Sequence, residues 1–574
     1  MRKQKVTTGV FRLLLLGVLT LFVVACGGGG QSGTTTTTKA PASQQKFIFT
    51  NAGVQDIETF DPALVTDLPS STAINLVFTG LVTLDENLNV QPEIASSWDI
   101  SSDGLTYTFH LKSNVKFSDG TAVTSADVAY SIDRALQPAT KSPVAGSYLN
   151  LIKDSDLLGT GKIKTIINDS LKTPDPQTIS ITLSKKAAYF LDALAYPTSY
   201  VVEKSIVEKY GKSWTDHLDE GGGTGPFKVQ SYQHNKQIVF VPNPNYYGPK
   251  PQLQQIIMPF YQDVKTAYQV YQTGKVDITP IPITNIQQAR ARTGEYSETP
   301  QLSIDYLGMN YLVKPYDNVH FRQALSLAIN RDQIMSAIWK NTRKPTYHIV
   351  PQGMPGYNAS LTGPAGVTST AGDKDKANQL LQQALKEMGL SSPSQLPPLQ
   401  LYYPTGSQDV TNEITTLTSQ WQSVLGITVK PVATDFNKLL EDLNALPGNP
   451  KGIGFWSIAW IADYPDPQDW LTLQFDKGSP NNQVNYGQNN STDAAQQQQV
   501  QKNLEAADAM DNGSARYQAY NQAEQQLVND VAWLSLDQRI GVRLLKPYVI
   551  GMKFNAQGLF PPELWADVYI AQHS

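Results

Sequence analysis

An N-terminal apolar run ends at the only cysteine of the chain. These two features predict that the protein is exported and that it folds without an internal disulfide bond. Arg2, Lys3 and Lys5 precede residues 13–25, an apolar segment too short and too one-sided to span a bilayer comfortably. This order of charged and apolar residues is typical of an export signal. Because Cys26 is the only cysteine, the exported chain has no partner for an internal disulfide bond. The hydrophobic fraction of 40% in 574 residues is enough for sizeable cores in several domains or lobes.

The residues around Cys26 offer an explanation for that cysteine. The stretch VVAC at 23–26 resembles a bacterial lipoprotein signal, in which the cysteine receives lipid and becomes the first residue of the mature protein. The alternative is an ordinary signal peptide with an incidental cysteine. Residues 27–45, GGGGQSGTTTTTKAPASQQ, cannot build a core and predict a flexible tether. We therefore expect a signal peptide at 1–25, a lipidated cysteine with its tether at 26–45, and an extracytoplasmic body anchored to the outer face of the cell membrane.

Strand and helix signals are intermixed along the rest of the chain. LTYTFHL at 105–111 alternates apolar and polar residues as a half-buried strand does. Thr124, with Asp127 three residues later, predicts the capped start of a helix. FKVQSYQHNKQIVFV at 227–241 predicts two strands joined by a short turn, and 414–425 has apolar residues at helical spacing. These signals predict α/β or α+β lobes, and propensity alone gives no lobe boundaries.

The sequence does not match the common templates for catalysis. GKS at 211–213 has no glycine where a phosphate-binding loop requires it, and no G-x-S-x-G elbow is present for a hydrolase serine. The six histidines are scattered without metal-ligand spacing. A net charge of −5 gives no basic footprint for nucleic acid. We therefore expect no catalytic residues, no metal, no cofactor and no nucleic-acid partner.

One segment concentrates acids and aromatic side chains. AWIADYPDPQDW, residues 459–470, places Asp463, Asp466 and Asp469 among two tryptophans, a tyrosine and two prolines. The spacing and the prolines do not suit a calcium loop. A glycosidase pair stays open, because its second carboxylate could come from any part of the chain. A desolvated aspartate in a stiff, apolar loop would instead favour an opposing cation, while Asp466 and Asp469 have a structural interpretation in which they cap turns.

Six segments occur in an order that resembles one known family. In chain order they are ASSWDISSDGLTYTFHLKSNVKFSDGTAVTSADVAYS at 95–131, GTGPFKVQSY with NPNYYG, TGKVDI at 273–278, YDNVHFRQALSLAINRDQI at 316–334, WQSVLGITV and WIADYPDPQDWL. The resemblance is to the bacterial extracellular solute-binding proteins of the oligopeptide/dipeptide/nickel family, which are the receptors of ABC importers. It runs from about residue 47 to the C-terminus, which is nearly the whole mature chain.

The resemblance implies a fold and a lobe organisation. The fold would be α/β, of the periplasmic-binding-protein-like type II, with two hinged α/β lobes and a third, inserted lobe. Lobe I would combine 46–78, 225–304 and 537–574; the inserted lobe II would be 79–224, and lobe III would be 305–536. The ligand would sit between lobes I and III, which close around it by a hinge motion.

The resemblance also implies roles for single residues. In peptide-binding members, an aspartate at the position of Asp463 meets the protonated α-amino group of the peptide. The backbone of Ala459, Trp460 and Ile461 would pair with the extended peptide like an added strand, with Trp460 beside the side chains of the ligand.

The same resemblance implies two more contacts, and two alternatives to the expected function stay open. Leu68 would flank the other edge of the ligand, and Phe436 falls where peptide-binding relatives often place an aromatic residue. We expect a monomeric oligopeptide receptor that delivers its ligand to the permease of an ABC importer. The alternative is a receptor of the same family for an oligosaccharide, with Trp456, Trp460 and Trp470 as stacking platforms. A remote alternative is a secreted glycosidase that uses Asp463 as acid or nucleophile.

Overall fold

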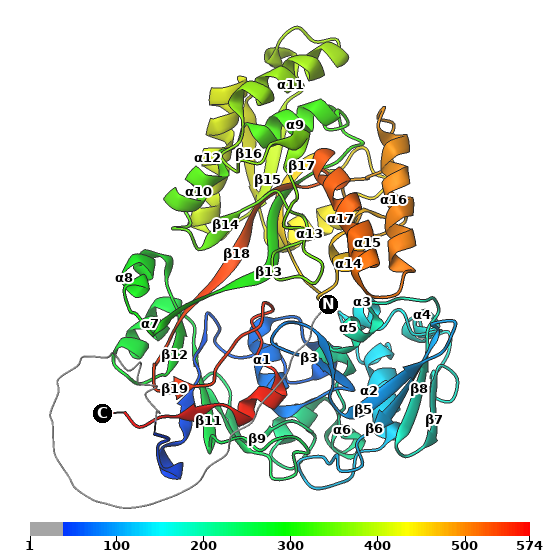
Figure 1. The fold of residues 1–574 in the computed structure, drawn as a ribbon, viewed down its shortest axis with the longest axis vertical. Helices are drawn as coiled ribbons and strands as arrows, with labels where there is room; N and C mark the ends of the chain where they lie inside the picture. The colour runs from blue at the N-terminus through cyan, green and yellow to red at the C-terminus, as the bar shows by residue number, and fades with distance from the viewer. Residues whose placement is uncertain (1–37, 574) are drawn as a thin grey trace, which may run out of the picture. The chain divides into compact units, whose positions relative to one another are not determined.

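The structure, a computed structural model, describes residues 38–573 (Figure 1). The predicted signal peptide, Cys26 and most of the predicted tether lie outside these residues. The prediction that the tether continues to residue 45 is wrong, because Ala40 and Gln45 are buried. Gln45 Nε2 donates hydrogen bonds to the carbonyl oxygens of Ala40 at 2.8 Å and Ile570 at 2.9 Å. A polar stretch with the composition of a linker thus ties the two ends of the body together.

The first sheet joins segments from distant parts of the chain. Its strands are β1 (Lys46–Ile48), β2 (Asn51–Ala52), β9 (Phe227–Gln233), β10 (Gln237–Pro242) and β11 (Gln255–Tyr261). The two strands predicted at 227–241 form as β9 and β10, which pair antiparallel. Asn235, in the turn between them, has a positive φ of 61°, a conformation that asparagine tolerates well. β10 pairs with β11, which then pairs in parallel with β1 and β2.

The second sheet has four antiparallel strands and one covering helix. They are β5 (Ala95–Ile100), β6 (Thr106–Leu111), β7 (Leu171–Asp175), β8 (Thr178–Thr182) and the helix α2 (Ser125–Leu136). The predicted alternation is confirmed in β6, where Tyr107, Phe109 and Leu111 are buried. The predicted capping box is also confirmed, because the backbone N–H and the hydroxyl of Thr124 both donate to Asp127 Oδ2.

The third sheet has seven strands, six of them in the order β12, β18, β13, β17, β15, β16. Their bounds are β12 (Ile278–Pro280), β13 (Tyr296–Met309), β14 (Arg343–Pro345), β15 (Leu399–Pro404), β16 (Val429–Thr434), β17 (Phe455–Ile461) and β18 (Leu534–Leu545), with β14 pairing on β18. Two small sheets complete the strands: β3 (Val82–Leu84) with β4 (Val90–Pro92), and β19 (Val549–Ile550) with β20 (Tyr569–Ile570).

Sixteen further α-helices complete the fold of residues 38–573. They are α1 (Leu68–Val77), α3 (Ala145–Tyr148), α4 (Ser155–Gly159), α5 (Phe190–Leu194), α6 (Lys204–Tyr210), α7 (Val264–Gln272), α8 (Ile286–Arg290), α9 (Val319–Leu327), α10 (Arg331–Ala337), α11 (Lys374–Glu387), α12 (Gln408–Leu425), α13 (Phe436–Asn444), α14 (Pro467–Trp470), α15 (Thr472–Phe475), α16 (Ala494–Asp508) and α17 (Ser514–Asn529). The predicted apolar face at 414–425 is confirmed in α12, whose Ile414, Leu417, Trp421 and Leu425 are buried. Within residues 38–573, no helix combines the length and the apolar character that a membrane crossing requires.

The two longest strands, β13 and β18, pair antiparallel over most of their length (Figure 1). Their pairing runs from Tyr296 opposite Leu544 to Leu307 opposite Leu534. The predicted lobe boundaries at 304/305 and 536/537 both fall inside this pair. A hinge between lobes I and III would therefore bend these two strands, and the boundaries themselves stay predictions.

Candidate ligand-binding cavity

A cavity of about 290 Å³ brings together three of the residues singled out in the sequence. Leu68 comes from the first turn of α1, Ile461 from the last position of β17, and Asp463 from the loop after β17. Leu68 is 42% exposed and Ile461 is 60% exposed, so both offer apolar surface to a ligand. The cavity is also lined by Thr66, Asp67, Ser71, Val144, Tyr148, Tyr196, Gln301, Leu302, Ser303, Ala462, Arg539, Ala556, Gln557 and Leu559.

The carboxylate of Asp463 has little compensation from the protein. Its Oδ1 accepts a hydrogen bond from the Tyr148 hydroxyl at 3.3 Å, and no other described residue donates to this carboxylate or forms an ion pair with it. Burial raises the pKa of Asp463 to about 6, while the hydroxyl of Tyr148 opposes that rise. A cation that enters the cavity would offset the cost of burying the charged form.

Tyr148 reaches Asp463 from a distant part of the chain. It is the last residue of α3, and its ring stacks on that of Tyr196 with the centroids 3.7 Å apart and the planes at 9°. The Tyr196 hydroxyl donates to the carbonyl oxygen of Val65 at 3.3 Å, which fixes that ring on the cavity wall. Sequence reasoning missed Tyr148 because it precedes Asp463 by 315 positions and belongs to no shared motif.

The other two aspartates of the loop are engaged inside it. Asp466 caps α14 by accepting from the N–H of Gln468 at 2.9 Å, and it accepts two hydrogen bonds from the buried Arg516 guanidinium at 2.6 and 2.7 Å. Asp469 is fully buried, and its Oδ2 accepts from Trp460 Nε1 at 3.0 Å and from the N–H of Asp463 at 3.3 Å. These contacts hold the loop, so Asp463 is the one of the three that faces the cavity.

The strand that leads into the loop has one unpaired edge. On one side, Ala459, Trp460 and Ile461 lie opposite residues 303–305 of β13. On the other side, β15 meets β17 only at Tyr402 opposite Trp456. Among the strands of residues 38–573, none continues this second edge along 459–461, so its backbone groups are available to an extended ligand.

Four predicted aromatic contacts are placed away from the cavity wall. Trp456 and Trp470 are fully buried, so the hypothesis that they act as stacking platforms for sugar rings is wrong. Trp460 packs against the core and donates its N–H to Asp469, and it is not among the residues that line the cavity. Phe436, the first residue of α13, is 49% exposed and also does not line it.

The charged residues of the cavity wall were only partly anticipated. Asp67 caps α1 by accepting from the N–H of Ser70 at 2.8 Å, and its Oδ2 is buried without a hydrogen-bond partner among the described residues. Arg539 donates from Nε and Nη2 to Asp305 at 2.8 and 3.0 Å. The DLPS stretch at 67–70 carries a helix-capping signal that could have identified Asp67. Within residues 38–573, no group of three or more His, Cys, Asp or Glu side chains is arranged to hold a metal ion.

Two long paired strands, and a cavity whose wall carries an under-compensated carboxylate, fit a solute-binding receptor. The family model of the bacterial extracellular solute-binding proteins, family 5, matches residues 89–482, and the chain belongs to this family.

Curated relatives and solved structures agree with this assignment. The periplasmic oligopeptide-binding protein OppA of Escherichia coli is 28% identical, over 93% of this chain and 94% of that protein. The oligopeptide-binding protein OppA of Bacillus subtilis is 28% identical, over 74% of this chain and 77% of that protein. The unliganded open form of the murein tripeptide binding protein MppA has a TM-score of 0.76 at 26% identity, covering 94% of this chain and 99% of that one. The predicted periplasmic-binding-protein-like fold of type II is therefore confirmed.

Proposed function

We propose that this protein is the extracytoplasmic substrate-binding receptor of an ABC importer and that it captures oligopeptides in the cavity around Asp463. The observation that carries this proposal is the partly desolvated Asp463 carboxylate, which faces the cavity with a tyrosine hydroxyl as its partner. A free peptide brings an α-amino group with an ordinary pKa near ~8, so it supplies the missing cation at neutral pH. Relatives named for oligopeptide binding support the same class of ligand.

The unpaired edge of β17 would orient the peptide. An extended peptide that starts at Asp463 can continue along 459–461 and exchange backbone hydrogen bonds with this edge. The exposed side chains of Ile461 and Leu68 then meet the peptide's side chains from two different elements. Backbone pairing and apolar contact do not select one sequence, so we expect broad specificity.

The oligosaccharide alternative loses its main support. Two of its three proposed stacking platforms, Trp456 and Trp470, are in the core. A neutral sugar also provides no charge to offset a buried carboxylate at Asp463. The glycosidase alternative needs a second carboxylate near Asp463. Asp466 and Asp469 are used to hold the loop, and Asp67, on the same cavity wall, is used to cap α1.

The partners and the location of the protein belong to the same proposal. A lipid on Cys26 would hold the receptor at the outer face of the membrane, where a short tether raises its effective concentration near the permease. The extracellular character of the family supports export. We expect the receptor to act as a monomer and to release its ligand chemically unchanged.

Native mass spectrometry of the purified protein tests the proposed ligand. We expect co-purified peptides over a broad mass range, because backbone pairing and an amine contact tolerate many sequences. Protein that has been unfolded, dialysed and refolded is the control, and it should carry no ligand until a peptide mixture is added. Recovery of one discrete sugar in place of peptides would refute the proposal.

The pH dependence of peptide binding tests the role of Tyr148. Because the pKa of Asp463 is about 6 in the free protein and a bound ammonium lowers it, affinity is highest between that pH and the ordinary pKa of the peptide's amine, about 8. Affinity falls as the pH drops through the pKa of Asp463. Tyr148→Phe removes the hydroxyl that holds the pKa of Asp463 down. We expect the acidic edge of the affinity profile, measured by isothermal titration calorimetry, to move to higher pH in this variant.

Tyr196→Phe is the matched control for that experiment. It keeps the ring stacked on Tyr148 and removes a hydroxyl that donates to the carbonyl oxygen of Val65. The acidic edge should therefore move less in the control than in Tyr148→Phe, because the hydrogen bond to Asp463 comes from Tyr148. An edge that does not move in Tyr148→Phe would contradict the contact between Tyr148 and Asp463.

A further inference from the structure

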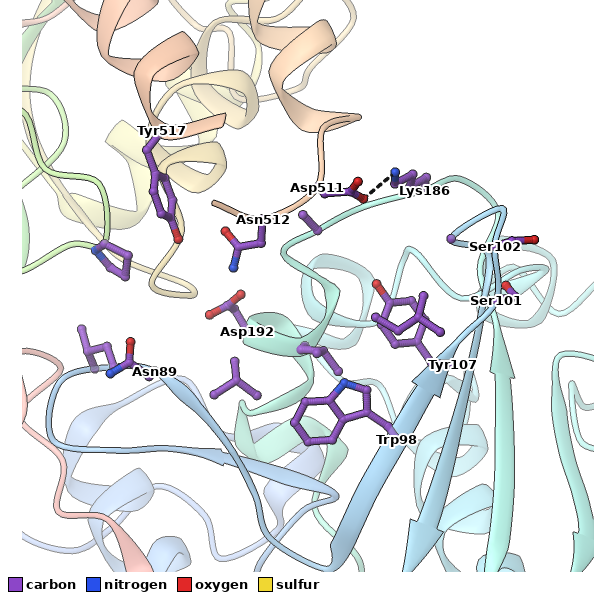
Figure 2. A pocket seen from close by; sticks show the side chains of 17 residues that line it. Asn89, Trp98, Ser101, Ser102, Tyr107, Lys186, Asp192, Asp511, Asn512 and Tyr517 are labelled. Atoms are coloured by element: carbon purple, nitrogen blue, oxygen red, sulfur yellow. Dashed lines mark ion pairs between the residues drawn. The ribbon is translucent and has the colours of Figure 1, made fainter. Parts of the chain in front are cut away.

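A second, larger cavity of about 630 Å³ shares no lining residue with the first (Figure 2). It lies among the β5–β6 hairpin, the helix α5 and the segment that leads into α17. The hairpin and α5 belong to the predicted lobe II, and α17 to the predicted lobe III. It is lined by Leu88, Asn89, Val90, Trp98, Ile100, Ser101, Ser102, Gly104, Tyr107, Lys186, Ala188, Leu191, Asp192, Pro355, Asp511, Asn512 and Tyr517.

The floor of this cavity carries a buried carboxylate without a partner. Asp192 on α5 is 8% exposed, and Figure 2 shows its carboxylate directed into the cavity, beside the amide of Asn512. No other residue among 38–573 forms a hydrogen bond or an ion pair with this carboxylate. Burial raises the pKa of Asp192 well above its usual range, the charge of Asp466 adds to this rise, and Arg516 opposes it.

The cations near Asp192 are engaged elsewhere. Lys186 Nζ forms an ion pair with Asp511 Oδ1 at 2.7 Å, drawn as a dashed line in Figure 2. Arg516 donates both of its terminal amino groups to Asp466. The protein thus leaves Asp192 without a counter-charge, although an unpaired buried carboxylate is among the costliest groups to keep in a folded protein.

Aromatic rings stand around this carboxylate on both sides of the cavity. Trp98 and Tyr107 come from β5 and β6, and Tyr517 comes from α17 (Figure 2). Burial raises the pKa of Tyr107, and the charges of Asp192 and Asp511 add to this rise. Burial also raises the pKa of Tyr517, where the charges of Asp466 and then Asp192 add to it. Ring faces attract organic cations, and the attraction is strongest for tryptophan.

We propose that this second cavity binds a small organic ammonium ion, with Asp192 as its counter-charge and Trp98, Tyr107 and Tyr517 as its aromatic walls. A carboxylate and three rings match an ammonium group that carries apolar substituents. The carboxylate offsets the positive charge, and the ring faces attract the cation and contact its apolar substituents. The volume is within the range of cavities that hold small molecules. The amide of Asn512 can bind a hydroxyl or carbonyl group elsewhere on the same ligand. This site shares no lining residue with the cavity of about 290 Å³ around Asp463.

Choline is a suitable probe, and its neutral isostere dimethylbutanol is the matched ligand control. We expect isothermal titration calorimetry to show binding of choline and not of dimethylbutanol, and tryptophan fluorescence to change with the same affinity. Asp192→Asn should weaken choline binding roughly 10- to 100-fold, as for the loss of a charge-assisted contact. Asp99→Asn removes an equal charge beside Trp98 from an exposed position outside the cavity, and should leave choline binding unchanged.

Two further measurements keep the test decisive. Asp192→Asn should melt at or above the wild-type temperature, because burial disfavours the charged form of the carboxyl group that it replaces. If that variant does not fold, Trp98→Leu should weaken choline binding at least several-fold through the lost ring face. Absence of choline binding to the wild-type protein, equal binding of dimethylbutanol, or unchanged affinity in the folded cavity variants would overturn the proposal. Peptide binding should be unaffected by Asp192→Asn, so this result is separate from the test of the peptide cavity.

Discussion

Replacing Asp463 by asparagine is expected to weaken peptide binding by about 2–5 kcal/mol, or roughly 30-fold to several thousand-fold. The substitution keeps the shape of the side chain and removes the charge that meets the peptide's ammonium group. The loss is large because the Asp463 carboxylate is largely buried, so the bound ammonium would be left without a counter-charge away from bulk water. Calorimetric titration of the ligand-free protein with a short peptide such as trialanine measures the effect.

A double-mutant cycle with an N-acetylated peptide assigns that loss to the amine. N-acetylation removes the ammonium charge from the ligand, so it should cost the wild-type protein about as much as Asp463→Asn does. The two changes remove the same contact, so N-acetylation should cost the variant almost nothing more. Additive losses would mean that Asp463 and the α-amino group do not interact. Unfolding of Asp463→Asn should show no loss of stability, because burial disfavours the charged carboxylate that it replaces.

The elements of this fold that could be predicted from the sequence are those whose conformation depends on residues close together in the chain. The alternation in β6 and the capping box of α2 depend on residues two to three positions apart, so they are visible in any short window. The predicted hairpin at 227–241 is similarly local. The position of Asp463 on a cavity wall was predicted from the family resemblance of its loop, since the loop's own residues left several chemistries open.

The rest of the site depends on contacts that sequence spacing does not encode. Tyr148 meets Asp463 across 315 positions, and the aromatic character of the two tryptophans beside the loop says nothing about their depth. Trp456 and Trp470 are equally good candidates for core packing and for ligand stacking until the sheet places them inside. Gln45 shows that sequence composition does not predict long-range contacts of polar residues either. The segment around it has the composition of a linker, but its hydrogen bonds to Ala40 and Ile570 make it part of the folded body.

The ion pair between Asp466 and Arg516 explains how the binding loop keeps its shape, and breaking it should have the largest effect on stability. Arg516 is fully buried, and its two terminal amino groups donate to the two carboxylate oxygens of Asp466 at 2.6 and 2.7 Å. Asp466→Asn leaves the guanidinium buried without a counter-charge. We expect the free energy of unfolding, measured by urea denaturation, to fall by about 3–5 kcal/mol.

Two further variants test whether the loss of stability comes from leaving the Arg516 charge buried without a counter-charge. The first is a control at an exposed ion pair, and the second removes both buried charges. Lys438→Met breaks the exposed ion pair with Asp442, which lies at 2.6 Å on the surface of α13, and should leave the denaturation midpoint unchanged. Combining Asp466→Leu with Arg516→Met removes both buried charges together, and should restore most of the stability lost in Asp466→Asn. Wild-type stability in Asp466→Asn would show that Arg516 has another counter-charge. Two buried carboxylates lie near enough to be candidates: Asp508, which Arg516 reaches through the hydroxyl of Tyr520, and Asp192, whose pKa burial raises and the charge of Arg516 lowers.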